Sequence, residues 1–310
     1  MLALLLGALA PVLTGDAAPP VLIARGVTLA GVPIGGMAVE QARAAMHPAF
    51  TKPLRVRYRS SEWRLNAARF GTHVAIVDGV ARALAAQPGA RLALVPRLSI
   101  PAVRRYVRVL DHRISFPATD AELVGLNGVD PDFSVPRTGI ALDRPVTVAR
   151  IVRALRSRTR PTVQVSVHAV APQKTAGDFG AIIVIRRGIN ELRLYDGPTL
   201  VRTFPVATGR AEFPTPTGRW EIVDKQLNPW WRPPDSPWAQ GLKPIPPGPG
   251  NPLGTRWMGL SAAGVGIHGT PDAASVGYSA SHGCIRMQIP DAEWLFQHVS
   301  IGTPVFIVDA

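Results

Sequence analysis

The sequence predicts an α+β protein, in which a mixed α/β region precedes a mostly β, sandwich-like region. Residues 21–170 alternate between stretches of strand period and stretches of helix period. Residues 181–310 instead carry many short apolar runs separated by turn signals, with one clear helix. Residues 171–180 (APQKTAGDFG) between them are typical of a linker. A length of 310 residues also favours two domains over one.

In the first region, alternation of apolar and polar residues predicts strands, and spacing near 3.6 residues predicts helices. The clearest strand is Leu54–Tyr58 (LRVRY), which we expect to pair with Trp63–Leu65 in a hairpin. The clearest helix is Val103–Leu110, where apolar residues recur at i, i+3, i+4 and i+7. The other expected elements are strands at 22–29, 114–117, 139–142 and 162–167, and helices at 39–46, 78–86 and 146–155.

In the second region, a hairpin is expected from the apolar runs Ala181–Arg187 and Leu192–Tyr195, which flank a glycine turn. A helix is expected near Pro290–Val299, because proline suits the first helical position and acidic residues are favoured near a helix N-terminus. Short strands with turn signals and little helix favour a β-sandwich. The other expected strands are 200–207, 218–223, 255–260, 264–268 and 304–308.

The stretch Asp224–Gly254 holds three tryptophans and nine prolines, so it cannot form a regular helix or strand. A long irregular segment in a compact domain is often a lid or a binding wall. Trp230 and Trp231 are therefore candidate substrate contacts. Alternatively, the tryptophans only pack the segment onto the sheet, and the sequence leaves both interpretations open.

The charge is strongly basic and unevenly placed. Residues 1–180 hold 23 Lys/Arg against 11 Asp/Glu, whereas residues 181–310 hold 11 against 10. An excess of this kind suggests an anionic partner, such as an anionic wall polymer, and the alternative is a solvated basic surface. No nucleic-acid-binding motif accompanies the scattered arginines, so we expect no nucleic-acid partner.

Residues 1–20 are expected to be a signal peptide or the remnant of a membrane anchor. Met1–Leu13 is apolar and leads into small residues, as in a signal peptide, and is too short to span a bilayer alone. A buried N-terminal helix is the alternative. The expectation is export to the cell wall or periplasmic space. The chain has one cysteine, so no intramolecular disulfide can form.

The strongest chemical signal is the motif SHGCIR at 281–286, which contains the single cysteine, Cys284. A second motif, IHGT at 267–270, supplies His268. A thiol becomes a useful nucleophile when a base or a positive charge favours its thiolate. A lone cysteine is more often a small buried hydrophobe. Here, polar neighbours and a glycine indicate a loop, so the pattern predicts a Cys–His acyl-transfer site.

These two motifs resemble the pattern of the L,D-transpeptidase family with its YkuD-like catalytic domain. The resemblance extends to PTPTG (214–218), NPLGTRW (251–257) and GTPV (302–305), and it covers roughly residues 180–309. It implies a mostly β catalytic domain that forms 3-3 peptidoglycan cross-links through a thioester on the cysteine. Residues 21–170 resemble the peptidoglycan-binding domain of VanW-like proteins, on GV (26–27), GGM (35–37) and GIALD (139–143).

The resemblance assigns the base to His268, with the Gly269 backbone or a nearby group holding its tautomer. Adjacent side chains in an extended turn diverge, so we expect His282 to orient Ser281 or the loop. Arg286 either binds a substrate carboxylate or braces the loop. The predicted site residues are Cys284 and His268 for catalysis; Ser281, His282, Gly283 and Gly269 for the oxyanion hole and positioning; and Arg286, Trp257, Trp230 and Trp231 for substrate binding.

The implied reaction is attack of Cys284 on the carbonyl between the third, diamino acid residue and the terminal D-Ala of a tetrapeptide stem. An amine of a second stem then resolves the thioester. The implied partners are peptidoglycan stem peptides and glycan, and no cofactor is expected. Two other functions stay open: an L,D-carboxypeptidase, in which water replaces the amine, and a non-enzymatic wall-binding protein. A zinc site on His268, His282 and Cys284 is disfavoured, because the motifs contain no CxxC and no acidic residue.

Overall fold

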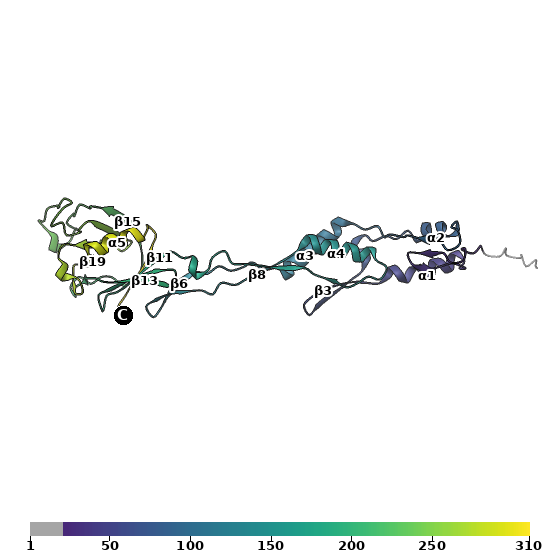
Figure 1. The fold of residues 1–310 in the computed structure, drawn as a ribbon, viewed down its shortest axis with the longest axis horizontal. Coiled ribbons are helices and arrows are strands. Elements are labelled where there is room, and N and C mark those ends of the chain that lie inside the picture. The colour runs from purple at the N-terminus through teal and green to yellow at the C-terminus, as the bar shows by residue number, and fades with distance from the viewer. Residues whose placement is uncertain (1–20) are drawn as a thin grey trace, which may run out of the picture. The chain divides into compact units, whose positions relative to one another are not determined.

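The computed structural model describes residues 21–310, so the expectation of a signal peptide or anchor at 1–20 lies outside the described residues (Figure 1). The described chain forms two compact units, one from residues 21–117 and 140–169, the other from residues 118–139 and 170–310. The sequence suggested one continuous first domain over 21–170, a linker at 171–180 and a catalytic domain at 181–310. The structure instead assigns 118–139 and the expected linker to the second unit. Within residues 21–310, no helix has the length and apolar character required to cross a membrane.

The first unit contains two separate hydrophobic cores. One core lies between helices α1 and α2 and a small sheet of order β2-β1-β5. The other core lies between helices α3 and α4 and a sheet of order β4-β3-β9. The elements are β1 (Thr28–Leu29), β2 (Val32–Pro33), α1 (Val39–Thr51), β3 (Leu54–Tyr58), β4 (Ser61–Leu65), the 3-10 turn Ala67–Phe70, α2 (Ile76–Leu84), β5 (Arg91–Leu92), α3 (Ile100–Ile114), β8 (Gly139–Leu142), α4 (Arg144–Arg156), β9 (Val163–Gln164) and β10 (Val167–Val170).

Local sequence signals account for most elements of this unit. The expected hairpin forms, with Leu54 paired to Leu65, and the alternation of β3 buries its leucine and valine while its arginines stay exposed. Helix α3 begins after Ser99, whose hydroxyl accepts the Ala102 N–H at 3.3 Å. Helix α1 runs past the expected end at residue 46, because Phe50 continues its buried stripe. The expected strand 22–29 is regular only over β1.

The second unit is built on one eight-stranded sheet, of order β13-β12-β11-β20-β15-β16-β17-β19. Ala207, just after β13, forms a β-bridge with Arg286 in β19, so the two ends of the sheet meet. The large core lies inside this near-closed sheet. The strands are β11 (Ala181–Arg186), β12 (Glu191–Asp196), β13 (Thr199–Pro205), β15 (Gly218–Leu227), β16 (Arg256–Leu260), β17 (Gly266–Thr270), β19 (Ile285–Gln288) and β20 (Pro304–Val308).

The mostly β character of this unit was predicted, but its layering differs from the expected sandwich. Short strands and turns have the same pattern in a sandwich and in a curled single sheet, and only the pairing of remote strands separates the two. The smaller elements are the pair β14 (Thr208–Gly209) and β18 (Ser279–Ser281), helix α5 (Ile289–His298), and 3-10 turns at Ala176–Asp178, Pro237–Ala239 and Ala273–Ser275.

A hairpin of β6 (Leu123–Asn127) and β7 (Asp130–Phe133) covers the outer face of this sheet. Ile182 and Val184 of β11 pack there, and the Tyr195 hydroxyl donates to Asp130 at 2.6 Å. With both faces covered, β11 is a continuous apolar run. The sequence did not predict this hairpin, because its glycines and its proline resemble loop signals.

Candidate active site

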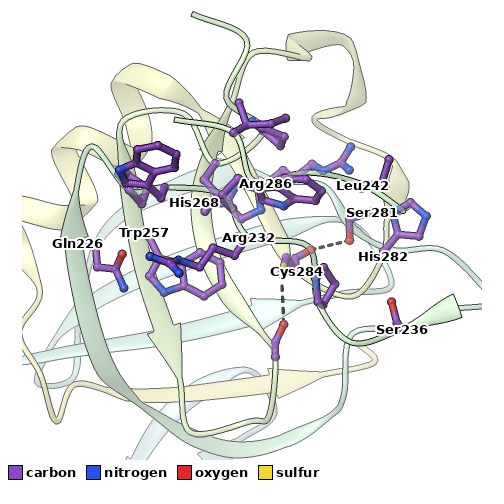
Figure 2. Close-up of a pocket in the computed structure, with 18 of the residues that line it drawn as sticks. Gln226, Arg232, Ser236, Leu242, Trp257, His268, Ser281, His282, Cys284 and Arg286 are labelled. Atoms are coloured by element: carbon purple, nitrogen blue, oxygen red, sulfur yellow. Dashed lines mark hydrogen bonds between the residues drawn. The ribbon is translucent and has the colours of Figure 1, made fainter. Parts of the chain in front are cut away.

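A cavity of about 1380 Å³ lies in the second unit, beside the end of β19 that carries the cysteine motif (Figure 2). It contains eight of the ten residues that the sequence predicted for the site, whereas Gly269 and Gly283 do not line it. The eight lining residues are Cys284, His268, Ser281, His282, Arg286, Trp257, Trp230 and Trp231.

The parallel pairing of β17 and β19 brings the two motifs together. His268 is the register partner of Arg286, and Cys284 directly precedes the first residue of β19. Because side chains alternate along a strand, residues 284 and 286 point to the same face of the sheet. The thiol and the imidazole therefore line one cavity although 16 positions separate them in the sequence.

Ser281 organises the cysteine loop. Its hydroxyl donates to the Cys284 carbonyl at 2.6 Å and accepts the Gly283 N–H at 3.1 Å. Thr215 donates its hydroxyl to the Gly283 carbonyl at 2.9 Å. Gly283 has φ 111°, a conformation that favours glycine. The Gly283 N–H, expected in the oxyanion hole, is donated to Ser281 in this structure, so it would have to change partners to face an oxyanion.

His268 is held as a neutral base. Only 4% of the residue is exposed, and Nδ1 lies 2.6 Å from the Gly269 carbonyl oxygen. A carbonyl can only accept, so Nδ1–H donates and Nε2 keeps its lone pair. Burial lowers the pKa of His268 to about 4, the nearby Arg286 acts in the same direction, and the Gly269 carbonyl opposes the change.

The Cys284 side chain is half-buried, with Sγ 3.6 Å from the Gly264 carbonyl oxygen. Burial raises the pKa of the thiol, while the backbone at Gly266 and the positive charge of Arg286 oppose the rise. A raised thiol pKa beside a lowered imidazole pKa describes a neutral resting pair.

The sequence suggested that His282 orients Ser281 or the loop, and in the structure its ring packs against two aromatic side chains. Its ring stacks on Trp238 at a centroid distance of 4.1 Å and packs against Phe213 at 5.1 Å. Burial lowers the pKa of His282, helped by the positive charges of Arg210 and Arg286. His282 therefore joins the irregular segment to the cysteine loop. Trp238 and Phe213 were absent from the predicted site, and no local signal distinguished them.

The irregular segment that forms one wall of the cavity has a defined internal structure. Asn251 is 1% exposed, and its side-chain amide donates to the carbonyls of Pro229 at 2.9 Å and Pro246 at 3.0 Å. Trp231 and Ile245 exchange two backbone hydrogen bonds, which tie the two limbs of the segment together. The prediction that this proline-rich stretch is irregular is confirmed from residue 228 onward, and its first residues continue β15.

The sequence pattern of the L,D-transpeptidase catalytic domain family (YkuD) matches residues 180–307. The chain is also 37% identical over 133 residues to a Bacillus subtilis protein named "Putative L,D-transpeptidase YqjB", a match that covers 41% of this chain and 70% of that protein.

The chain belongs to the L,D-transpeptidase family.

A second relative, "Putative L,D-transpeptidase YkuD" of Bacillus licheniformis, is 38% identical over 116 residues, which cover 37% of this chain and 58% of the relative. Among solved structures, a mutant L,D-transpeptidase from Enterococcus faecium is 16% identical, with a TM-score of 0.37, over 86% of this chain and 98% of that one. The family assignment depends on the sequence matches.

The cavity of this family member is cationic. Arg232, Lys243 and Arg286 line it, and its described lining contains no aspartate or glutamate. The unit as a whole holds 13 Lys/Arg against 15 Asp/Glu in residues 118–139 and 170–310, so the positive lining is a local feature. Such a cavity favours ligands that carry carboxylates. Within residues 21–310, no cluster of three His, Cys, Asp or Glu side chains is arranged to hold a metal ion.

We expect His268 to make the L,D-transpeptidase less stable in mild acid. Its pKa is about 4 in the folded chain and near 6.5 when unfolded, so the unfolded state binds more protons between these values. The contribution to the free energy of unfolding is complete above pH 6.5 and is lost as pH falls to 4, with a total of about 3 kcal/mol. Denaturant titrations at pH 7.5, 5 and 4 measure it. The loss should be smaller by that amount in His268→Gln, and equal losses in both proteins would contradict the assignment.

Proposed function

We propose that the chain is a cysteine-dependent L,D-transpeptidase that forms 3-3 peptidoglycan cross-links through a thioester on Cys284. The observation that carries this proposal is that Cys284 and a neutral His268 line one cavity, with Nδ1 of the imidazole occupied and Nε2 left as the acceptor. A neutral base beside a thiol is the arrangement that general-base activation of a cysteine requires. Membership of the L,D-transpeptidase family supports the choice of reaction.

In the proposed acylation, Nε2 of His268 takes the thiol proton as Sγ of Cys284 attacks the carbonyl carbon of the diamino acid, at its bond to D-Ala. The tetrahedral intermediate breaks its C–N bond, and the imidazolium gives its proton to the departing amine of D-Ala. A thioester remains. An amine of a second stem then attacks the thioester, His268 takes the proton from that amine, and the C–S bond breaks. The sulfur leaves with the proton, which restores the neutral pair.

The lining of the cavity supports a peptide donor that carries carboxylates. Arg286 is half-buried and shares the sheet face of the thiol, so its guanidinium can engage a stem carboxylate. Its 3.9 Å ion pair with Asp272 instead favours the bracing role that the sequence left open. Trp230 and Trp231 add aromatic surface to the lining, suited to the apolar parts of a peptide or sugar.

Mass spectrometry of the purified chain with a disaccharide-tetrapeptide tests the proposal. We expect a thiol-dependent adduct that lacks D-Ala and proceeds to a cross-linked dimer. An adduct that resolves only to free tripeptide would make the protein an L,D-carboxypeptidase. Absence of any adduct, together with retention on insoluble wall, would leave a non-enzymatic wall-binding protein.

We further propose that the protein is exported and that its first unit binds the cell wall, including its anionic polymers. Residues 21–117 and 140–169 hold 21 Lys/Arg against five Asp/Glu, so the whole basic excess of the chain lies in this unit. Purified Cys284→Ala protein should sediment with insoluble wall, and the bound fraction should fall as salt rises from 50 to 500 mM, because salt screens exposed charges. Binding that is indifferent to salt would argue against the electrostatic part of this proposal.

A further inference from the structure

Two glycines face each other across strands β16 and β17, the strands that carry the cavity residues Trp257 and His268. Gly259 and Gly266 are register partners in this antiparallel pair, and Trp257 with His268 is the pair two positions further along the strands. Because side chains alternate along a strand, all four positions belong to the same face of the sheet. The glycines therefore leave a bare strip of backbone directly beside the catalytic imidazole.

The indole of Trp257 occupies this bare strip. A Cβ added to Gly266 would lie 2.3 Å from an indole ring carbon and within 2.6 Å of two more. A Cβ added to Gly259 would lie 3.0 Å from the indole nitrogen. Real Cβ atoms do not approach other atoms to 2.3 Å, so any side chain at position 266 would displace the ring. The glycine pair thus gives the indole the space to lie flat on the sheet.

From this position, the indole reaches the catalytic imidazole. The rings of Trp257 and His268 are stacked, with centroids 5.9 Å apart and an interplanar angle of 29°. Figure 2 shows both residues in the wall of the cavity that contains Cys284. The Gly269 carbonyl holds one edge of the imidazole through Nδ1. The stacked indole lies against one face of the same imidazole.

We propose that Trp257 is a positioning residue that holds the His268 imidazole in its catalytic orientation, and that the Gly259–Gly266 pair accommodates its indole. The hydrogen bond at Nδ1 leaves the ring free to pivot about that contact, and stacking removes this freedom. The indole also keeps water from one face of the imidazole, which disfavours the charged form. This inference depends on the proposed function, and it differs from the sequence-based expectation that Trp257 binds substrate.

Four variants of the full chain test the proposal: Trp257→Ala, Trp257→Phe, Gly266→Ala and the double variant Trp257→Ala/Gly266→Ala. We expect Trp257→Ala to lower the acylation rate constant at saturating donor by about 10- to 100-fold, as loss of orientation typically does, with little change in KM. Trp257→Phe should retain more activity. Gly266→Ala should resemble Trp257→Ala, because the new methyl group displaces the indole. The double variant should be no slower than Trp257→Ala alone, since the methyl group then has nothing to displace.

A matched control is Gly180→Ala, since a Cβ at Gly180 meets no atom within 4 Å. Thermal unfolding of each variant identifies any that fails to fold. An NMR titration of the His268 ring, assigned with His268→Gln, gives a readout that needs no reaction. The pKa should rise toward 6.5 in Trp257→Ala and in Gly266→Ala, but not in Gly180→Ala.

Three results would overturn the proposal. A Trp257→Ala variant that raises only KM would make the indole a substrate contact. Multiplicative losses in the double variant would mean that the glycine acts independently of the indole. An unchanged His268 titration would show that the indole does not control the imidazole. If no variant and no wild-type protein forms an adduct, the proposed function fails, while the titration still decides whether Trp257 positions His268.

Discussion

Replacement of Cys284 by alanine is expected to abolish acylation, with a loss on the order of 10⁴-fold or more. The chain has no second thiol, and no other group in the cavity can form the thioester. The substitution removes one half-buried sulfur whose hydrogen bond, to the Gly264 carbonyl, is 3.6 Å long, so the fold should survive. Mass spectrometry of the protein after incubation with a tetrapeptide stem measures the loss directly.

Cys284→Ser is the matched variant for this experiment, because it keeps the hydrogen-bonding side chain but replaces sulfur by oxygen. A hydroxyl is a much poorer nucleophile beside a base as weak as this imidazole, so we expect it to be nearly as inactive as the alanine variant. Both variants should unfold at the temperature of the wild type and should still sediment with insoluble wall. Full cross-linking by Cys284→Ala would refute the thioester mechanism.

The two histidines of the cavity are expected to respond very differently to substitution. His268→Ala should lower acylation by about 10²- to 10⁴-fold, the range typical for loss of a general base. His282→Ala should retain part of the activity, because the imidazole of His282 packs against Trp238 and Phe213 rather than acting as the base. The rate of adduct formation at saturating stem separates the two.

The buried position of His268 requires a second variant, since alanine there leaves a cavity. His268→Gln fills more of the space and should be as inactive as alanine if the base is what matters. His168→Ala, an exposed histidine in the other unit, is the control and should be fully active. Greater loss in His282→Ala than in both variants of His268 would reverse the assignment of the base.

Local signals in the sequence determined much of the fold. Period-two alternation predicted the hairpin Leu54–Tyr58 with Trp63–Leu65, and the run of prolines predicted that the segment after β15 is irregular. The motifs around Cys284 and His268 predicted the family and which two residues would meet in one cavity. Each of these inferences depends on chemistry or periodicity within a short stretch, which is why the sequence alone supports them.

The tertiary structure decided what depends on pairing between remote segments. The expected sandwich is a single near-closed sheet, because Ala207 pairs with Arg286, 79 positions away in the sequence. The hairpin at 123–133 belongs to the second unit, because Ile182 and Val184 need a cover on the outer face of β11. Neither pairing leaves a local trace in the sequence.

The same distinction holds within the site. The sequence predicted that Trp257 belongs to the site and binds substrate, and nothing near it in the sequence indicates the glycine pair on which its proposed positioning role depends. Gly259 and Gly266 lie against the indole only because the register of β16 and β17 places them opposite each other, on the face that carries Trp257 and His268. The sequence thus determined which chemical groups are available, and the strand register determined which of them touch. Contact in a sheet depends on alignment across strands, whereas a motif records only neighbours along the chain.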